Sequence, residues 1–187
     1  GQILIHGTPG NGKTRFARGL AGHLGMDCFE IIDSRPGDEL RADQRLRCFA
    51  NAHELMRAHD RTLLLFDECD EAISTDQGGH ALGRLASSKS RIHAAVESDA
   101  VPGLWIANDI DKVHASTLRR FVMIAEMPAL PDSTRTRILR EALGDLPVDE
   151  TWLTQVSRVQ SITPALIQRA ACIGKAVSTT LGGQASE

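Results

Sequence analysis

Short runs of apolar residues alternate with longer stretches of helical periodicity along the first two thirds of the chain. Two runs, Leu63–Phe66 and Leu104–Ala107, are continuously apolar, which is typical of strands buried on both faces. Helical periodicity separates the runs at residues 13–24, 39–58 and 87–98. Strands that alternate with helices predict a parallel sheet with right-handed crossovers. We therefore expect an α/β fold with strands at Gln2–His6, Cys28–Asp33, Arg61–Phe66, Gly103–Ala107 and Phe121–Glu126.

The pattern changes after the last expected strand. Pro128 and Pro131 interrupt it, and only helical periodicity follows. We expect three helices here, with Asp132 or Ser133 capping the first, Gly144 ending it and Thr163 capping the last, over residues 132–143, 149–159 and 164–178. The chain is therefore divided into an α/β domain, residues 1–128, and a small helical domain, residues 129–187.

A glycine-rich segment links the first expected strand to the first helix. It reads Gly7-Thr8-Pro9-Gly10-Asn11-Gly12-Lys13-Thr14, a complete G-x-x-x-x-G-K-T phosphate loop. The glycines let backbone amides turn toward phosphate oxygens, and the following helix adds the positive end of its dipole. Lys13 is expected at the β- and γ-phosphates and the Thr14 hydroxyl at Mg²⁺, whereas a plain glycine-rich turn needs neither residue. The sequence predicts that a nucleoside triphosphate binds through Thr8, Pro9, Gly10, Asn11, Gly12, Lys13 and Thr14.

Acidic and amide residues follow the two continuously apolar strands. Asp67 and Glu68 come directly after one, and Asn108 after the other. Phosphoryl transfer needs a carboxylate near the metal and a group that orients or deprotonates the attacking water. We therefore assign Asp67 to the metal and Glu68 to the water, while Asn108 donates to the γ-phosphate or holds that water. Acids and Asn are also common in turns, so these assignments depend on the phosphate loop upstream.

Two arginines, Arg119 and Arg120, precede the fifth expected strand. One interpretation is that they favour the negative end of a helix. The other is that they are arginine fingers, which neutralise charge on a transferring phosphoryl group. On this element they would point toward the site of a neighbouring copy. We expect finger function for at least one of them, with Arg120 ahead of Arg119.

These motifs together resemble the AAA+ ATPase superfamily, most closely the classic AAA type, over nearly the whole chain. Gly7–Thr14 matches Walker A, Leu63–Glu68 matches Walker B, Asn108 matches the first sensor, and Leu118–Phe121 is similar to the arginine-finger element. The resemblance implies a P-loop NTPase three-layer sandwich with a five-stranded parallel sheet in the order 5-1-4-3-2, followed by a small helical lid. It also implies Mg²⁺-dependent ATP hydrolysis in an oligomeric ring, often a hexamer, that remodels a protein client.

The chain departs from this superfamily at two places. Residues 33–38, where many members place an aromatic pore loop, read Asp-Ser-Arg-Pro-Gly-Asp and offer no aromatic side chain. Residues 163–166 lack the arginine of a second sensor, and Arg169 is expected to be a solvated lid residue instead. The missing aromatic keeps open an alternative function, an ATP-dependent switch or assembly module with slow hydrolysis and no polypeptide threading.

Composition and charge narrow the classes of binding partner that the chain can have. The 187 residues include 21 Lys and Arg against 24 Asp and Glu, a net charge of −3. This balance gives no reason to expect nucleic-acid or membrane affinity, and it weighs against a DNA-binding clamp loader or initiator. No apolar run approaches the ~18 residues of a membrane span. The four cysteines lie far apart with no C-x-x-C pair, so we expect buried thiols and a cytoplasmic protein.

Other features are expected to be structural. Trp105 and Trp152 are expected to pack in apolar interiors. The seven histidines show no metal-ligand spacing. Residues 74–80 are expected to form a surface loop. The arginines of the second helix alternate with acids, which is typical of a solvated face or a ring interface; they are Arg41, Arg45, Arg47 and Arg57.

Overall fold

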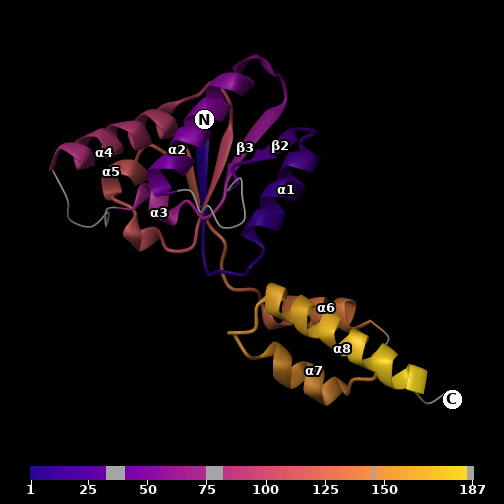
Figure 1. Ribbon diagram of the computed structural model, residues 1–187. Helices are drawn as coiled ribbons and strands as arrows, with labels where there is room; N and C mark the ends of the chain where they lie inside the picture. The colour runs from indigo at the N-terminus through magenta and orange to yellow at the C-terminus, as the bar shows by residue number, and fades with distance from the viewer. Residues whose placement is uncertain (33–40, 75–81, 145, 185–187) are drawn as a thin grey trace. The chain divides into compact units, whose positions relative to one another are not determined.

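The structure is a computed structural model that describes residues 1–32, 41–74, 82–144 and 146–184 (Figure 1). Side chains are described in these ranges except at 42–43, 71, 82–89 and 179–184. The pore-loop position, residues 33–38, and the expected surface loop beyond residue 74 lie outside the described residues. The chain forms two compact units. The first unit contains Gly1–Gly7 and Lys13–Met127, and the second contains Thr8–Gly12 and Pro128–Glu187.

The first unit is built on a five-stranded parallel sheet in the order β2-β3-β4-β1-β5, which confirms the implied order. All residues of the two continuously apolar strands are buried, as predicted, because helices cover both of their faces. β2 begins and ends at different residues from those expected, while β3 and β5 begin later than expected and end where expected. The strands are β1 (Gln2–His6), β2 (Asp27–Glu30), β3 (Thr62–Phe66), β4 (Gly103–Ala107) and β5 (Met123–Glu126).

One face of the sheet is covered by α1 (Lys13–His23), whose Ala17 and Ala21 pack against Ile5 and Leu65 (Figure 1). The small alanine side chains on this helix let it approach the sheet closely. The start of α1 is therefore fixed directly beside the carboxyl end of β1.

The opposite face is covered by α2 (Ala42–Leu55) and α4 (Leu82–Glu97). Phe49, Phe66 and Trp105 form an aromatic cluster there, with ring centroids 4.6 to 5.4 Å apart. Trp105 is fully buried, which confirms its expected core position. The remaining short elements of this unit are η1 (Met56–Ala58), α3 (Asp70–Ile73), η2 (Ile110–Lys112) and α5 (Ala115–Leu118).

A fully buried glutamine, Gln2, joins the aromatic cluster to the turn before β4. Trp105 Nε1 donates to Gln2 Oε1 at 3.0 Å. Gln2 Nε2 donates to the carbonyl oxygens of Ser98 and Val101 at 2.7 and 2.9 Å. Each polar atom of this side chain thus has a partner, as burial requires.

The second unit contains three helices, α6 (Asp132–Leu143), α7 (Glu150–Ser157) and α8 (Pro164–Gln184), around Leu139, Leu153 and Ile167. Arg135 is only 3% exposed. Its Nε donates to the Ser157 carbonyl at 2.7 Å, which ties α6 to the end of α7. Among the described residues, no helix is long and apolar enough to cross a bilayer.

Several details of the second unit test the sequence predictions. Gly144 ends α6 with a φ of 58°, and Thr163 Oγ1 accepts from the Leu166 N–H at 3.4 Å, so both predicted signals are confirmed. The predicted cap of α6 is wrong, because Pro131 is the cap residue and no side chain caps the helix. α8 continues past Ser178 to Gln184, since no proline follows to stop it.

Trp152 corrects a further prediction. Its side chain is 44% exposed, although it was expected to be packed. The buried residues of α7 are Leu153 and Ser157, one helical turn apart, and Trp152 lies beside that buried stripe.

Candidate functional site

Gly7 directly follows β1 and has a conformation that only glycine adopts without strain. Its φ is +145°, and a Cβ at this position would overlap the carbonyl group of Met127, so no side chain fits. Gly12, directly before Lys13, also has a positive φ, of 89°. These two positions give the sequence motif its backbone path from β1 into α1. Within the second unit, the loop residues Thr8 and Asn11 are joined by a side-chain hydrogen bond of 2.6 Å.

Lys13 is buried at the first position of α1, with 5% of its surface exposed. Its Nζ donates to the Gly7 carbonyl at 2.7 Å and to Asn108 Oδ1 at 2.9 Å. Burial lowers the pKa of the Lys13 ammonium group, while the negative charges of Asp67 and Asp70 oppose this shift. The structure therefore brings together Lys13 and Asn108 at the carboxyl ends of β1 and β4.

Thr14 and Asp67 also lie together at this edge of the sheet. Thr14 Oγ1 donates to Asp67 Oδ2 at 2.5 Å, and Asp67 Oδ1 accepts from the Glu68 N–H at 2.8 Å. A hydroxyl and a carboxylate are hard oxygen ligands of the kind that Mg²⁺ prefers. No cluster of three or more His, Cys, Asp or Glu residues in the described part of the chain has metal-binding geometry. Thr14 and Asp67 together offer two oxygen ligands of that kind at this edge of the sheet.

Glu68 is exposed and has a φ of +49°, in the left-handed region that non-glycine residues rarely adopt. The guanidinium of Arg45 binds the backbone carbonyl before Glu68 and the carbonyl of Glu68 itself. Its Nη2 donates to the Asp67 carbonyl at 2.6 Å and its Nη1 donates to the Glu68 carbonyl at 3.0 Å. Arg45 thus corrects the expectation of a solvated helix face, because it reaches inward from α2 to the turn after β3.

Asp70 fixes the turn that carries Asn108. Its Oδ1 accepts from the backbone N–H groups of Asn108 and Asp109, each at 2.8 Å. The Cys69 N–H donates to the Ile106 carbonyl at 2.9 Å, which links the turn after β3 to β4 itself. Sequence reasoning gave Asp70 no role. Its place three residues after Asp67, at the start of a short helix, is the only signal the sequence offers.

Comparison with known protein families shows which family this chain belongs to. The sequence profile of the family described as "ATPase family associated with various cellular activities (AAA)" matches residues 3–129. The chain belongs to the AAA family. This match contains Lys13, Thr14, Asp67, Glu68 and Asn108.

The AAA domain is similar to proteins of several kinds. It is 26% identical over 157 residues to the replication factor C large subunit of Methanococcus vannielii, covering 83% of this chain and 30% of that protein. It is 26% identical over 173 residues to the spastins of Drosophila persimilis and Drosophila pseudoobscura, covering 84% of this chain and 21% of each. The chain thus spans less than a third of the length of these relatives. The crystal structure of the FIGL-1 AAA domain in complex with ADP has a TM-score of 0.66 and 15% identity, covering 91% of this chain and 59% of that chain.

The two candidate finger residues of the AAA domain lie after α5. Arg120 forms an ion pair with Glu97 at the end of α4, and its side chain is 34% exposed. Arg119 is exposed, and its Nε donates to the Ala115 carbonyl at 3.3 Å. In the described part of the chain, the polar contacts of both arginines are with α4 and α5. Arg169 is exposed on α8, as expected of a solvated residue.

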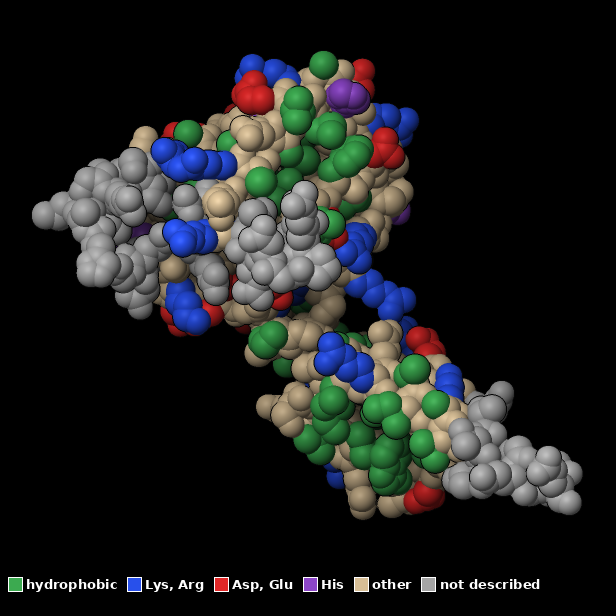
Figure 2. All heavy atoms as spheres, in the orientation of Figure 1, with side chains coloured by type: hydrophobic (Ala, Val, Ile, Leu, Met, Phe, Trp, Pro, Cys, Tyr) green, Lys and Arg blue, Asp and Glu red, His purple; other side chains and the backbone are tan. Residues whose placement is uncertain are grey.

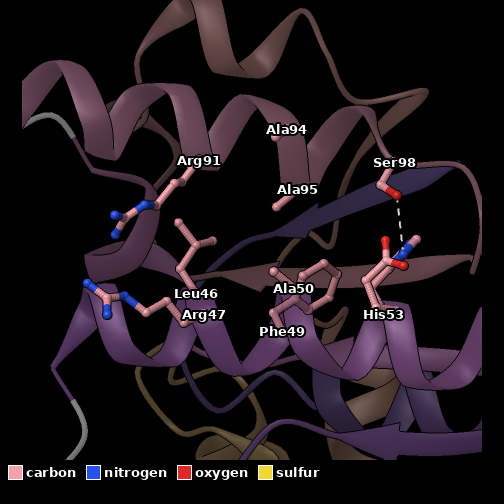
Figure 3. A pocket seen from close by; sticks show the side chains of 10 residues that line it. Leu46, Arg47, Phe49, Ala50, His53, Arg91, Ala94, Ala95 and Ser98 are labelled. Carbon is pink, nitrogen blue, oxygen red and sulfur yellow. Dashed lines mark hydrogen bonds between the residues drawn. The ribbon is translucent and has the colours of Figure 1, made fainter.

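A hollow of about 230 Å³ lies elsewhere, between α2 and α4 (Figure 3). Arg47 and Arg91 lie at one end of it, and His53 accepts or donates a 3.2 Å hydrogen bond with Ser98 at the other. Of the described residues, those assigned to nucleotide are not among its lining residues, so it is separate from the candidate site. The lining residues are Leu46, Arg47, Phe49, Ala50, His53, Glu54, Arg91, Ala94, Ala95 and Ser98.

Proposed function

We propose that this AAA domain binds ATP with Mg²⁺ and hydrolyses it. The observation that carries the proposal is the pair of side-chain hydrogen bonds at one edge of the sheet, from Lys13 to Asn108 and from Thr14 to Asp67. These four side chains come from three separate segments of the sequence. Their convergence at the carboxyl ends of β1, β3 and β4 supports a phosphate site with a magnesium site next to it. Residues 1–128 are proposed as the nucleotide-binding domain and residues 129–187 as the lid.

Binding is assigned to the loop and the first turn of α1. The backbone N–H groups of residues 8–14 are proposed to donate to phosphate oxygens, together with the positive end of the α1 dipole. Lys13 supplies a full positive charge. Thr14 and Asp67 would hold Mg²⁺, which when bound neutralises phosphate charge.

Hydrolysis is assigned to Glu68 and Asn108. The Glu68 carboxylate is proposed to accept the proton of the attacking water, and its exposed position leaves it accessible to that water. The Asn108 amide is proposed to orient the water or to donate to the γ-phosphate. Asp70 keeps the backbone at Asn108 in place through the two hydrogen bonds it accepts.

The site is proposed to be completed by a second copy of the chain in a ring. Arg120, ahead of Arg119, would donate to the phosphates held by the neighbour. Exposed apolar surface on both units supports self-association, since a lone domain rarely exposes large apolar patches. Hydrophobic side chains gather on the helices of the second unit (Figure 2). On the first unit, Val122 is 75% and Met123 is 54% exposed; on the second unit, Trp152 is 44% and Ile173 is 66% exposed.

Two uses of the hydrolysis cycle remain as candidates. The first is remodelling of a protein client within an oligomeric ring, a hexamer by resemblance to the superfamily. The second is a slow nucleotide-dependent switch or assembly module, which the lack of an aromatic residue at positions 33–38 favours. A cytoplasmic setting is proposed for either, supported by four cysteines that are all free thiols.

Steady-state phosphate release from Mg-ATP over a range of protein concentrations tests the proposal. Turnover per chain should rise with concentration, because each site needs an arginine from a neighbour. Fast release that a protein client stimulates would support the remodelling function, and slow unstimulated release would support the switch. Absence of phosphate release at every concentration would contradict hydrolysis.

A further inference from the structure

Arg45 makes three contacts with the end of β3. Its two terminal nitrogens donate to the carbonyl oxygens of Asp67 and Glu68, and its guanidinium carbon lies 5.2 Å from the centre of the Phe66 ring. The three residues it contacts are consecutive in the sequence. A single side chain from α2 thus holds the whole turn in which the strand ends.

The turn at Glu68 needs such an external contact. Its left-handed backbone is disfavoured for a residue with a side chain, and conformations of this kind persist only where the surroundings impose them. The carbonyl groups before and after the strained φ angle are the two that Arg45 binds. Asp67 Oδ1 adds the bond to the Glu68 N–H from within the turn.

Arginine is the side chain that fits this role. Its planar fork donates two hydrogen bonds in fixed directions and stacks on an aromatic ring, while a lysine ammonium is a compact charge without either property. Arg45 lies in the first turn of α2, where the helix dipole disfavours positive charge.

The first turn of α2 is itself fixed. The Arg41 N–H donates to Gln44 Oε1 at 2.9 Å, and the Gln44 N–H donates to the Arg41 carbonyl at 2.8 Å. The Arg45 N–H donates to the Arg41 carbonyl at 3.0 Å. The Arg45 guanidinium therefore extends from a helix turn whose backbone is fixed by these hydrogen bonds.

We propose that Arg45 is a positioning residue for ATP hydrolysis, which sets the backbone of Asp67 and Glu68 and so aims the Glu68 carboxylate. This inference rests on the proposed function for its effect on turnover. It assigns no contact between Arg45 and the nucleotide. Its loss should therefore lower kcat and leave the KM for ATP nearly unchanged.

Amide hydrogen exchange tests the contact without relying on hydrolysis. The Arg45→Ala and Arg45→Lys variants are compared with wild type and with Arg57→Ala, which removes the same charge from an exposed ion pair with Glu54. We expect the amides of Glu68 and Cys69 to exchange about tenfold faster in Arg45→Ala. Exchange in β4 and α6 should stay as in wild type. Arg45→Lys is expected to fold and to give an intermediate rate, since it can reach one carbonyl but not both.

Steady-state kinetics on the same variants test the consequence. In Arg45→Ala, kcat should fall about 10- to 100-fold, the effect of a small misplacement of a catalytic group. The KM should change by less than about threefold. Arg45→Lys should recover part of the kcat, and Arg57→Ala should match wild type.

Each outcome decides the inference. If Arg45→Ala loses protection throughout the chain, the folded Arg45→Lys variant decides in its place. Unchanged exchange at Glu68 and Cys69, or a kcat like that of Arg57→Ala, would overturn the positioning role. A loss that appears in KM alone would overturn it as well. If wild type releases no phosphate but the local exchange rises, the contact is supported and the proposed hydrolysis fails.

Discussion

Lys13 Nζ donates a hydrogen bond to Asn108 Oδ1 at 2.9 Å, which joins the first residue of α1 to the residue after β4. The two residues are distant in sequence but follow neighbouring strands, since β1 pairs with β4 along its whole length. A cation and an amide are thus held together where the parallel strands end. Ligands in open α/β sheets bind at this edge.

Glu68→Gln should keep Mg-ATP binding and lose turnover. The amide retains the size of the side chain but accepts no proton, and the loss of a general base lowers rates about 100- to 10,000-fold. Phosphate release and titration calorimetry on the same preparation measure the two properties. Turnover equal to wild type would remove Glu68 from the mechanism.

Mixing two inactive variants tests whether Arg120 acts in a neighbouring copy. Glu68→Gln and Arg120→Ala should each be inactive alone. Their mixture should release phosphate, because some sites then combine an intact Glu68 with an intact Arg120 from the other variant. Arg119→Ala replaces Arg120→Ala in the matched control.

If the mixture stays inactive while a mixed complex is detected, Arg120 does not act across the interface. If Arg119→Ala is the inactive variant that complements, the finger is Arg119. Arg120 forms an ion pair with Glu97 of its own copy. This ion pair must break before Arg120 can reach the phosphates of another copy.

The four cysteines should differ in their reactivity toward an alkylating agent at about pH 8. Cys48 and Cys172 are exposed and should react first. Burial raises the pKa of the Cys69 thiol well above its ordinary value, and the charges of Asp70 and Asp67 add to this shift. Because the thiolate is the reactive form, Cys69 should stay unmodified until the first unit unfolds.

Cys28 should react at an intermediate rate, since partial burial and Glu30 raise its pKa. Mass spectrometry of peptides sampled over time measures all four sites. Early modification of Cys69 in the folded protein would show that the turn after β3 is not packed as described.

Arg135→Ala should destabilise the second unit by about 2–4 kcal/mol. The substitution leaves the Ser157 carbonyl without its Arg135 partner and removes the bond to Asp132 Oδ1 at 2.5 Å. Thermal unfolding followed by circular dichroism gives the measurement. Arg158→Ala, which removes an exposed arginine just beyond α7, should leave the transition nearly unchanged. Equal effects of the two substitutions would contradict a structural role for Arg135.

The parts that the sequence predicted are those with strong local patterns. β3 and β4 were found because four or more consecutive apolar residues need cover on both faces. The glycine-rich loop was found because its residue types and spacing have few other uses. The order of the strands came from resemblance to a family, since periodicity alone does not say which strands pair.

The parts that the sequence missed depend on how elements meet in space. Arg45 looked like one of several helix arginines until the register of α2 against β3 placed its guanidinium at two carbonyls. Asp70 looked like one more acid after a strand. Trp152 was expected to be packed because it is large and apolar. In the structure, Leu153 and Ser157 form the buried face of α7, and Trp152 lies beside that face and is partly exposed.

Titration of Mg-ATP into the protein tests the central claim most directly, that the edge of the sheet at Lys13 binds a nucleoside triphosphate. Calorimetry should show saturable binding to wild type. Lys13→Ala, checked for folding by circular dichroism, should bind about 10- to 150-fold more weakly, as expected from the loss of a hydrogen bond from a charged group. No heat from wild type at millimolar Mg-ATP, or equal affinity of the two proteins, would contradict the account.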